Sequence, residues 1–98
     1  MHTQYIALDE FCSLHNIEIS FISSLQQTGL IEIDTINQAE FIEASQLQQV
    51  EKFMRLYYDL DINLEGIETI SHLLYRINSM QNEITVLKNR LRLYELSD

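Results

Sequence analysis

The sequence predicts a mostly α-helical fold: a winged helix-turn-helix with a small hairpin, then a third helix and a long C-terminal helix with coiled-coil heptads. Three observations predict it. Proline is absent and glycine occurs twice in 98 residues, so few residues break helices. Apolar side chains recur at helical spacing in several segments, and the last segment keeps a seven-residue repeat. We expect one part over residues 1–62 and a second over 63–98.

Two short helices joined by a tight turn are expected over residues 7–15 and 18–28, with Asn16 at the break. Gly29 suits the left-handed residue that closes a helix, and Leu30 can fold back as its hydrophobic contact. Two helices in this arrangement form a helix-turn-helix. In the first helix, Leu8, Phe11, Cys12 and His15 recur at helical spacing, and in the second Ile22 and Leu25 are expected to point inward.

A small hairpin, or wing, is expected after the second helix. Apolar and acidic residues alternate over 30–34, as in a strand, and Phe41-Ile42 forms the second arm.

The third helix is expected over residues 46–58. Ser45-Gln46-Leu47-Gln48 matches a capping box, in which the hydroxyl and the amide satisfy free backbone N–H groups. One face of this helix carries Leu47, Val50, Met54 and Tyr57.

The last helix is expected to run from Leu64 to about Leu96, roughly 50 Å at ~1.5 Å per residue. Asn63 is a good N-cap, and Ile62 can pack on Ile67 as a hydrophobic staple.

Strict heptad positions in this helix predict a left-handed supercoil with another helix. The a and d residues are Ile70, Leu73, Ile77, Met80, Ile84, Leu87, Leu91 and Tyr94. The rest of the chain is too short to cover this stripe, so we expect a homodimer. The expected interface is Ile77, Met80, Ile84, Leu87, Leu91 and Tyr94. Charged residues beside the stripe suit a parallel or an antiparallel pair, and docking of the stripe on another partner is the alternative.

Acidic residues dominate the first half of the chain. Residues 1–51 hold eight Asp and Glu and no Lys or Arg, whereas the remainder has seven acids and six bases. Such a surface repels nucleic acid and anionic lipid and attracts a basic partner.

The sequence lacks the common catalytic and cofactor motifs. It has no Gly-rich phosphate loop, no paired-cysteine metal spacing and no nucleophile elbow, and its three histidines lie far apart. Cys12 is expected to be a small core residue. We therefore expect no enzyme, no metal and no cofactor. A cytoplasmic location is expected, because residues 1–4 lack a secretion signal, no apolar run could span a membrane, and the single cysteine fits a reducing compartment.

Two parts of the chain resemble a known family. Leu8-Asp9-Glu10-Phe11-Cys12, then Ile17 and Gly29-Leu30-Ile31-Glu32, resemble the winged-helix start of the MerR-like superfamily. Residues 59–67, leading into Leu73-Leu74 and residues 83–91, resemble its CbpM-like chaperone modulators. The most specific piece is Asn63-Leu64-Glu65-Gly66-Ile67, and the likeness covers nearly the whole chain.

This resemblance implies a non-enzymatic adaptor. Members of that family bind the J-domain of a DnaJ-like co-chaperone, CbpA, block its stimulation of Hsp70 and can restrain its DNA binding. J-domains present a Lys/Arg-rich helix to Hsp70, so a competitor should display carboxylates. The expected docking residues are Asp9, Glu10, Glu18, Glu32 and Asp34.

Two other functions stay open. The first is a MerR-like DNA-binding transcription regulator, in which Gln26 and Gln27 of the second helix would contact adenine edges. The second helix and the wing carry no Lys or Arg for phosphate contacts. Ile33-Asp34-Thr35-Ile36 stands where the superfamily's basic wing would have Arg and Tyr residues. Lys52 and Arg55 are too few to compensate. The second is a plain homo-oligomerisation module.

Overall fold

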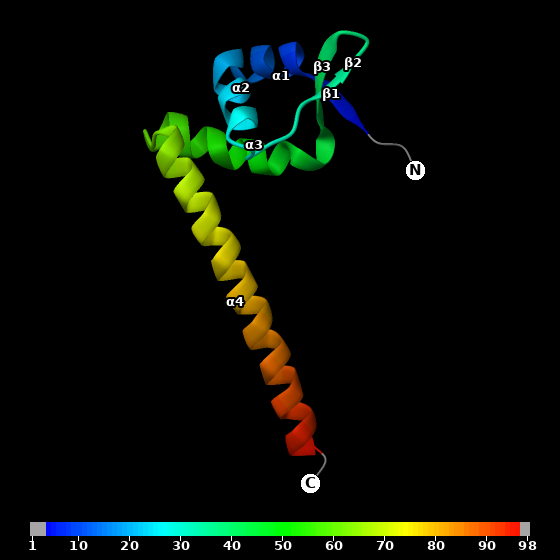
Figure 1. Ribbon diagram of the computed structural model, residues 1–98, viewed down its shortest axis with the longest axis vertical. Helices are drawn as coiled ribbons and strands as arrows, with labels where there is room; N and C mark the ends of the chain where they lie inside the picture. The colour runs from blue at the N-terminus through cyan, green and yellow to red at the C-terminus, as the bar shows by residue number, and fades with distance from the viewer. Residues whose placement is uncertain (1–3, 97–98) are drawn as a thin grey trace. The chain divides into compact units, whose positions relative to one another are not determined.

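The computed structural model describes residues 4–96 and shows a small α/β unit and a long helix (Figure 1). Residues 1–3, part of the segment expected to lack a secretion signal, and 97–98 lie outside the described residues. The chain divides into two compact units, one ending at Glu68 and the other beginning at Thr69, inside the long helix. Each unit is described by itself.

The helix-turn-helix is formed by α1 (Leu8–His15) and α2 (Ile19–Gln27). Each helix ends in a left-handed residue, Asn16 with φ 54° after α1 and Gly29 with φ 82° after α2. The N–H of the residue after each returns to the last turn: Ile17 N donates to the Cys12 carbonyl at 3.0 Å, and Leu30 N donates to that of Leu25 at 3.0 Å. Both ends are Schellman motifs, and the role predicted for Gly29 is confirmed.

The sheet has three antiparallel strands in the order β1–β3–β2: β1 (Tyr5–Ala7), β2 (Asp34–Ile36) and β3 (Ala39–Glu43). The hairpin β2–β3 turns through Asn37 and Gln38, which both have positive φ, 51° and 67°, as a type I′ turn requires. Strand β1 was not predicted. It pairs with β3 from Tyr5 opposite Glu43 to Ala7 opposite Phe41.

The first arm predicted over residues 30–34 is wrong, because the strand begins only at Asp34. Ile31 is 3% exposed and enters the core instead. The backbone of Glu32 is bonded to a side chain: its N–H donates to Gln46 Oε1 at 2.7 Å, and its carbonyl accepts from Gln46 Nε2 at 2.8 Å. These groups are therefore not available to a β-ladder.

Helix α3 (Leu47–Met54) lies between a 3-10 turn over Ala44–Gln46 and a π-helical turn over Arg55–Asp59. The predicted capping box between Ser45 and Gln48 is wrong: Ser45 lies inside the 3-10 turn, α3 begins only at Leu47, and the helix start has no side-chain cap hydrogen bond. Val50 is buried as expected, and so is Phe53, which was not predicted. Tyr57 packs on the Phe21 ring at 4.6 Å yet stays 36% exposed.

Helix α4 (Leu64–Leu96) begins as the sequence predicts. The Gly66 N–H donates to Asn63 Oδ1 at 2.8 Å, which confirms the N-cap. Ile67 is fully buried in the core of the first unit, and Ile62 packs against that core.

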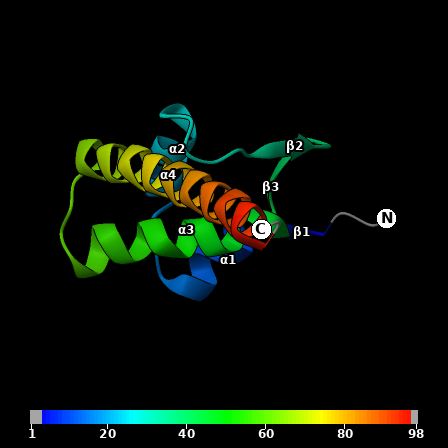
Figure 2. The same ribbon diagram turned by 90° about the horizontal axis from the view of Figure 1, so that it is seen from below.

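One hydrophobic core holds the first unit together, and α1, α2, α3 and β3 all contribute to it. Figure 2 shows the ribbon of these elements from below. Its buried members are Leu8, Phe11, Cys12, Phe21, Ile22, Leu25, Ile31, Ile42, Val50, Phe53 and Ile67. The two helices of the helix-turn-helix are thereby fixed on α3 and on the inner face of the sheet.

Candidate partner-binding site

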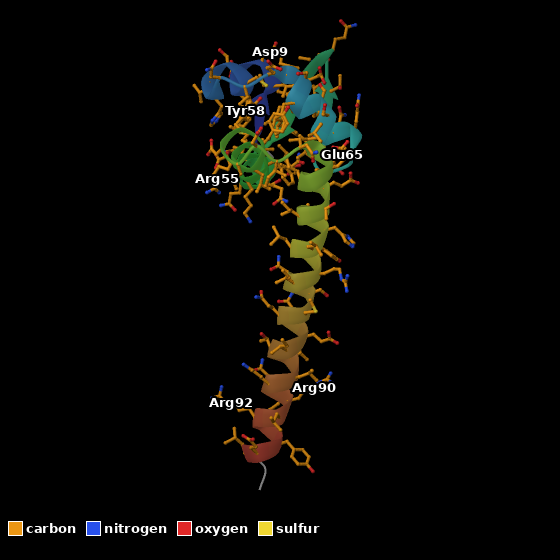
Figure 3. The ribbon with its side chains drawn as sticks, turned by 90° about the vertical axis from the view of Figure 1, so that its left-hand side faces the viewer. Asp9, Arg55, Tyr58, Glu65, Arg90 and Arg92 are labelled. Carbon is orange, nitrogen blue, oxygen red and sulfur yellow. The ribbon has the colours of Figure 1, made fainter. Side chains whose placement is uncertain are left out.

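The two units carry opposite charge. Residues 1–68 contain twelve Asp and Glu against two cations, Lys52 and Arg55, whereas residues 69–98 contain three acids and four Lys and Arg. The first unit therefore has a formal charge of −10 and the second of +1. Figure 3 places Asp9 and Arg55 on opposite sides of the first unit. Asp9, at the start of α1, therefore lies far from Arg55, one of the two cations of the first unit.

The five predicted docking residues lie on four different segments. Asp9 and Glu10 are exposed in the first turn of α1, Glu18 is the N-cap of α2, Glu32 is in the loop before the hairpin, and Asp34 begins β2. The first turn of a helix favours carboxylates on its own account, because the N-terminal end of the helix dipole is positive. The positions of Asp9 and Glu10 therefore have a structural reason besides any partner.

The sheet brings Asp34 near the start of α1. Asp34 and Ala7 both pair with Phe41, from opposite sides, so they stand in one row two strand spacings apart, about 10 Å. Ala7 is the N-cap of α1, directly before Leu8 and Asp9. Asp9, Glu10 and Asp34 thus belong to one region.

Glu18 belongs to another region, since the eight residues of α1, about 12 Å of helix, separate it from the first turn. Its backbone N–H donates to the Tyr58 hydroxyl at 3.4 Å, and its Oε2 accepts from Ser20 Oγ at 3.2 Å. Tyr58 packs edge-on against Phe21 at 5.3 Å, and Figure 3 shows its ring within the first unit. Glu18 therefore helps to hold the helix-turn-helix on the π-helical turn.

A hollow of about 440 Å³ opens beside the turn between α1 and α2. Its lining includes His15 and Ile17 on one side and Met54, Arg55 and Tyr58 on the other. The lining also includes the acids Glu51 and Asp59, and within residues 4–96 no three His, Cys, Asp or Glu side chains are arranged so that they could hold a metal ion.

The sheet presents an apolar outer face that sequence reasoning missed. Ile6 of β1 and Ile42 of β3 point into the core, so their neighbours along each strand point the other way. That outer face carries Tyr5, Ile36 and Phe41, with Asp34 and Glu43 on the same side. Tyr5 contacts Phe41 edge-on at 6.4 Å between ring centroids. The face became recognisable only with β1, whose three residues give too short an alternation to identify.

In helix-turn-helix proteins the second helix and the wing contact DNA, and in this protein neither of these elements carries a cation. Gln26 and Gln27 are exposed at the end of α2, but neither α2 nor the β2–β3 hairpin contains Lys or Arg. The hairpin instead carries Asp34, Glu40 and Glu43.

Cys12 is buried in the core. Burial raises the pKa of its thiol, and the negative charge of Asp9 raises it further. The thiol is therefore protonated and unreactive at neutral pH.

In the second unit, large apolar side chains remain exposed along α4. The predicted interface residues Ile77, Met80, Ile84, Leu87, Leu91 and Tyr94 are all exposed. Within residues 4–96, the helices are too short or too polar to cross a membrane.

Comparison with known proteins identifies the family. The family model described as MerR HTH family regulatory protein matches residues 6–89, which is most of the chain and includes the helix-turn-helix, the hairpin and much of α4. Neither the comparison with curated proteins nor that with solved structures found a match. The chain therefore belongs to the MerR helix-turn-helix family of regulatory proteins.

Proposed function

We propose that this protein is a non-enzymatic adaptor that binds the J-domain of a DnaJ/CbpA-like co-chaperone and thereby inhibits its action on Hsp70. One observation carries the proposal: the first unit has the fold of a DNA-binding helix-turn-helix protein but a formal charge of −10. A surface of that sign suits a Lys/Arg-rich protein helix and opposes a phosphate backbone. The likeness of residues 59–67 to the CbpM-like modulators supports the choice of a J-domain.

A net charge of this size acts mainly on the rate at which the two proteins associate and on the choice of partner. Opposite charges steer association and raise the on-rate, while a few buried apolar contacts hold the complex. The attraction between exposed groups is screened beyond about 8 Å at physiological salt. Binding should therefore weaken as salt rises without disappearing.

The test is titration of the wild-type protein and a charge-reversed variant with the J-domain. The variant carries Asp9→Lys, Glu10→Lys and Asp34→Lys, at the three predicted acids that lie in one region. We expect its affinity to fall at least about tenfold, or ~1.4 kcal/mol. A matched control reverses three exposed acids elsewhere, Glu51, Asp59 and Glu68.

Equal loss in both variants would mean that total charge, not this region, attracts the J-domain. Unchanged affinity in both would contradict the electrostatic basis of the proposal. Circular dichroism of each variant checks the fold, because lysines in the first turn of α1 cost about 0.3–1 kcal/mol each through the helix dipole.

We further propose that α4 makes the protein a homodimer. Its exposed a and d side chains form a stripe that a second helix can cover. Leu87→Lys should dissociate the dimer, since a charge in the seam opposes burial, whereas Asn89→Lys, at a position outside the seam, should not. Light scattering measures both, and a dimeric Leu87→Lys variant would contradict the assignment.

The second candidate is a DNA-binding regulator, which the family match favours. Gln26 and Gln27 are exposed where such proteins contact bases, but the phosphate contacts that supply most of the affinity have no Lys or Arg in α2 or the hairpin. Fluorescence anisotropy with duplex DNA at low salt distinguishes the two functions. Binding that is stronger than that of the J-domain would favour the regulator.

A further inference from the structure

We propose that the outer sheet face, formed by Tyr5, Ile36 and Phe41 with Asp34 and Glu43, binds a basic amphipathic helix of a protein partner. The apolar residues of that helix would lie on the three apolar side chains, and its Lys and Arg side chains would lie beside the two carboxylates. The inference rests on the proposed function, because it names the surface through which a basic partner is held.

The apolar part of this face lies outside the core. Tyr5 is 41% exposed and Ile36 is 43% exposed, and Phe41 is half-buried but does not pack with the core cluster. Ile36 pairs with Ala39, so it is diagonal to Phe41, within reach of an aromatic ring. Tyr5 touches Phe41 from the other side. The three side chains therefore form one strip across all three strands.

A small antiparallel sheet with one face on the core usually carries polar residues on the other. Here both faces carry large apolar residues, which marks the outer one as a candidate contact surface. Asp34 stands opposite Phe41 and Glu43 opposite Tyr5, so each aromatic residue has a carboxylate in the same row. Asp34 does not lie at a helix start, so the helix dipole that accounts for Asp9 and Glu10 does not account for Asp34. Glu43 directly precedes the 3-10 turn over Ala44–Gln46.

The size of the outer sheet face limits the affinity that we expect for the complex. The three strands span about 10 Å across and the longest, five residues, about 17 Å along. A typical stable interface buries about 800 Å² on each partner, several times the area of this face. The face is thus the apolar centre of an interface, and the neighbouring acids Asp9 and Glu10 at the start of α1 extend it. Affinity in the micromolar range is the expectation.

Charge selects the partner. The first unit of a second copy also has a formal charge of −10, so the same face on two copies would repel. A helix with Lys and Arg on both sides of an apolar stripe has complementary charge at Asp34 and Glu43 and complementary surface at the strip.

The experiment compares Ile36→Lys with Thr35→Lys. These neighbours in β2 are both exposed and both variants add one positive charge, but Ile36 lies on the outer face and Thr35 points the other way. Two probes are titrated into each full-length variant: the J-domain, and a synthetic amphipathic helical peptide of Leu and Lys. We expect Ile36→Lys to weaken both complexes by about tenfold or more and Thr35→Lys to change them less than about twofold. Tyr5→Ser is a second variant that removes an apolar contact without adding charge.

The outcomes separate this inference from the proposed function. If the J-domain binds and Ile36→Lys and Tyr5→Ser leave its affinity unchanged, the inference is overturned and the proposed function stands. If only the peptide binds, and Ile36→Lys abolishes that binding, the inference stands and the J-domain is not the partner. Failure of both probes to bind the wild-type protein overturns both. A change in oligomeric state on Ile36→Lys assigns the face to a second copy and overturns the inference.

Discussion

Replacing Gly66 with alanine should destabilise the first unit, although glycine to alanine inside an exposed helix usually adds about 1 kcal/mol of stability. Gly66 lies in the first turn of α4, and its N–H donates to the Asn63 cap at 2.8 Å. A Cβ at this position would stand 2.7 Å from Ile62 Cγ2 and 3.2 Å from Asn63 Oδ1. The first distance is too short for two carbon atoms. Ile62 is β-branched and stiff at χ1, so it cannot rotate away cheaply.

The expected loss in the free energy of unfolding follows from the displacement of Asn63 and Ile62 by the added carbon. Displacing the Asn63 cap costs about 1 kcal/mol, and forcing an extra carbon into a packed site costs about 1–3 kcal/mol. Against the gain in helix propensity of about 1 kcal/mol, the net loss is about 1–3 kcal/mol. For a domain of this size each kcal/mol lowers Tm by about 4–8 °C.

Thermal unfolding followed by circular dichroism measures this change at one fixed protein concentration, because self-association shifts Tm. Asn63→Ala alone should cost about 1 kcal/mol. The double variant Asn63→Ala/Gly66→Ala should lose less than the sum of the two single losses, since both remove the same cap. A Gly66→Ala protein that melts higher than the wild type would refute the reasoning.

Three further changes test other contacts. Gln38→Gly should stabilise the protein by about 1 kcal/mol in urea unfolding, because a non-glycine residue at positive φ is strained; a loss would contradict the turn assignment. Gln46→Ala should cost about 1 kcal/mol, since it removes both hydrogen bonds to the Glu32 backbone; an unchanged unfolding midpoint would show that these bonds contribute nothing. The Cys12 thiol should resist alkylation at neutral pH in the native state, because burial and the charge of Asp9 both raise its pKa. Asp9→Asn should lower that pKa and bring alkylation to lower pH, and an identical pH profile would rule out the charge effect.

The helical part of the fold was predictable because its signals are local. Apolar spacing located α1 and α2, Gly29 marked the end of the second helix, and Asn63 marked the start of α4. Each of these signals depends on residues within one or two turns of one another.

The sheet was not predictable in the same way. Strand β1 pairs with residues nearly forty positions away, and its three residues carry no turn signal. Residues 30–34 alternate like a strand, but Ile31 is needed in the core and the Glu32 backbone is held by Gln46, so pairing starts later. The predicted capping box is absent because a 3-10 turn over Ala44–Gln46 takes up Ser45 before α3 begins.

The candidate site was also only partly predictable, because its layout depends on pairing between distant residues. Composition predicted an acidic surface, and the sequence identifies each acid. Which acids share a region depends on the pairing of Phe41 with both Ala7 and Asp34, which sets Asp34 beside the start of α1. The outer sheet face depends on β1 and therefore stayed hidden in the sequence.

Isothermal titration of the full-length protein with the J-domain, at low and at moderate salt, tests the central proposal most directly. The proposal predicts saturable binding, micromolar or tighter, that weakens as salt rises. Absence of binding at both salt concentrations would contradict it, and only membership of the MerR helix-turn-helix family would then stand.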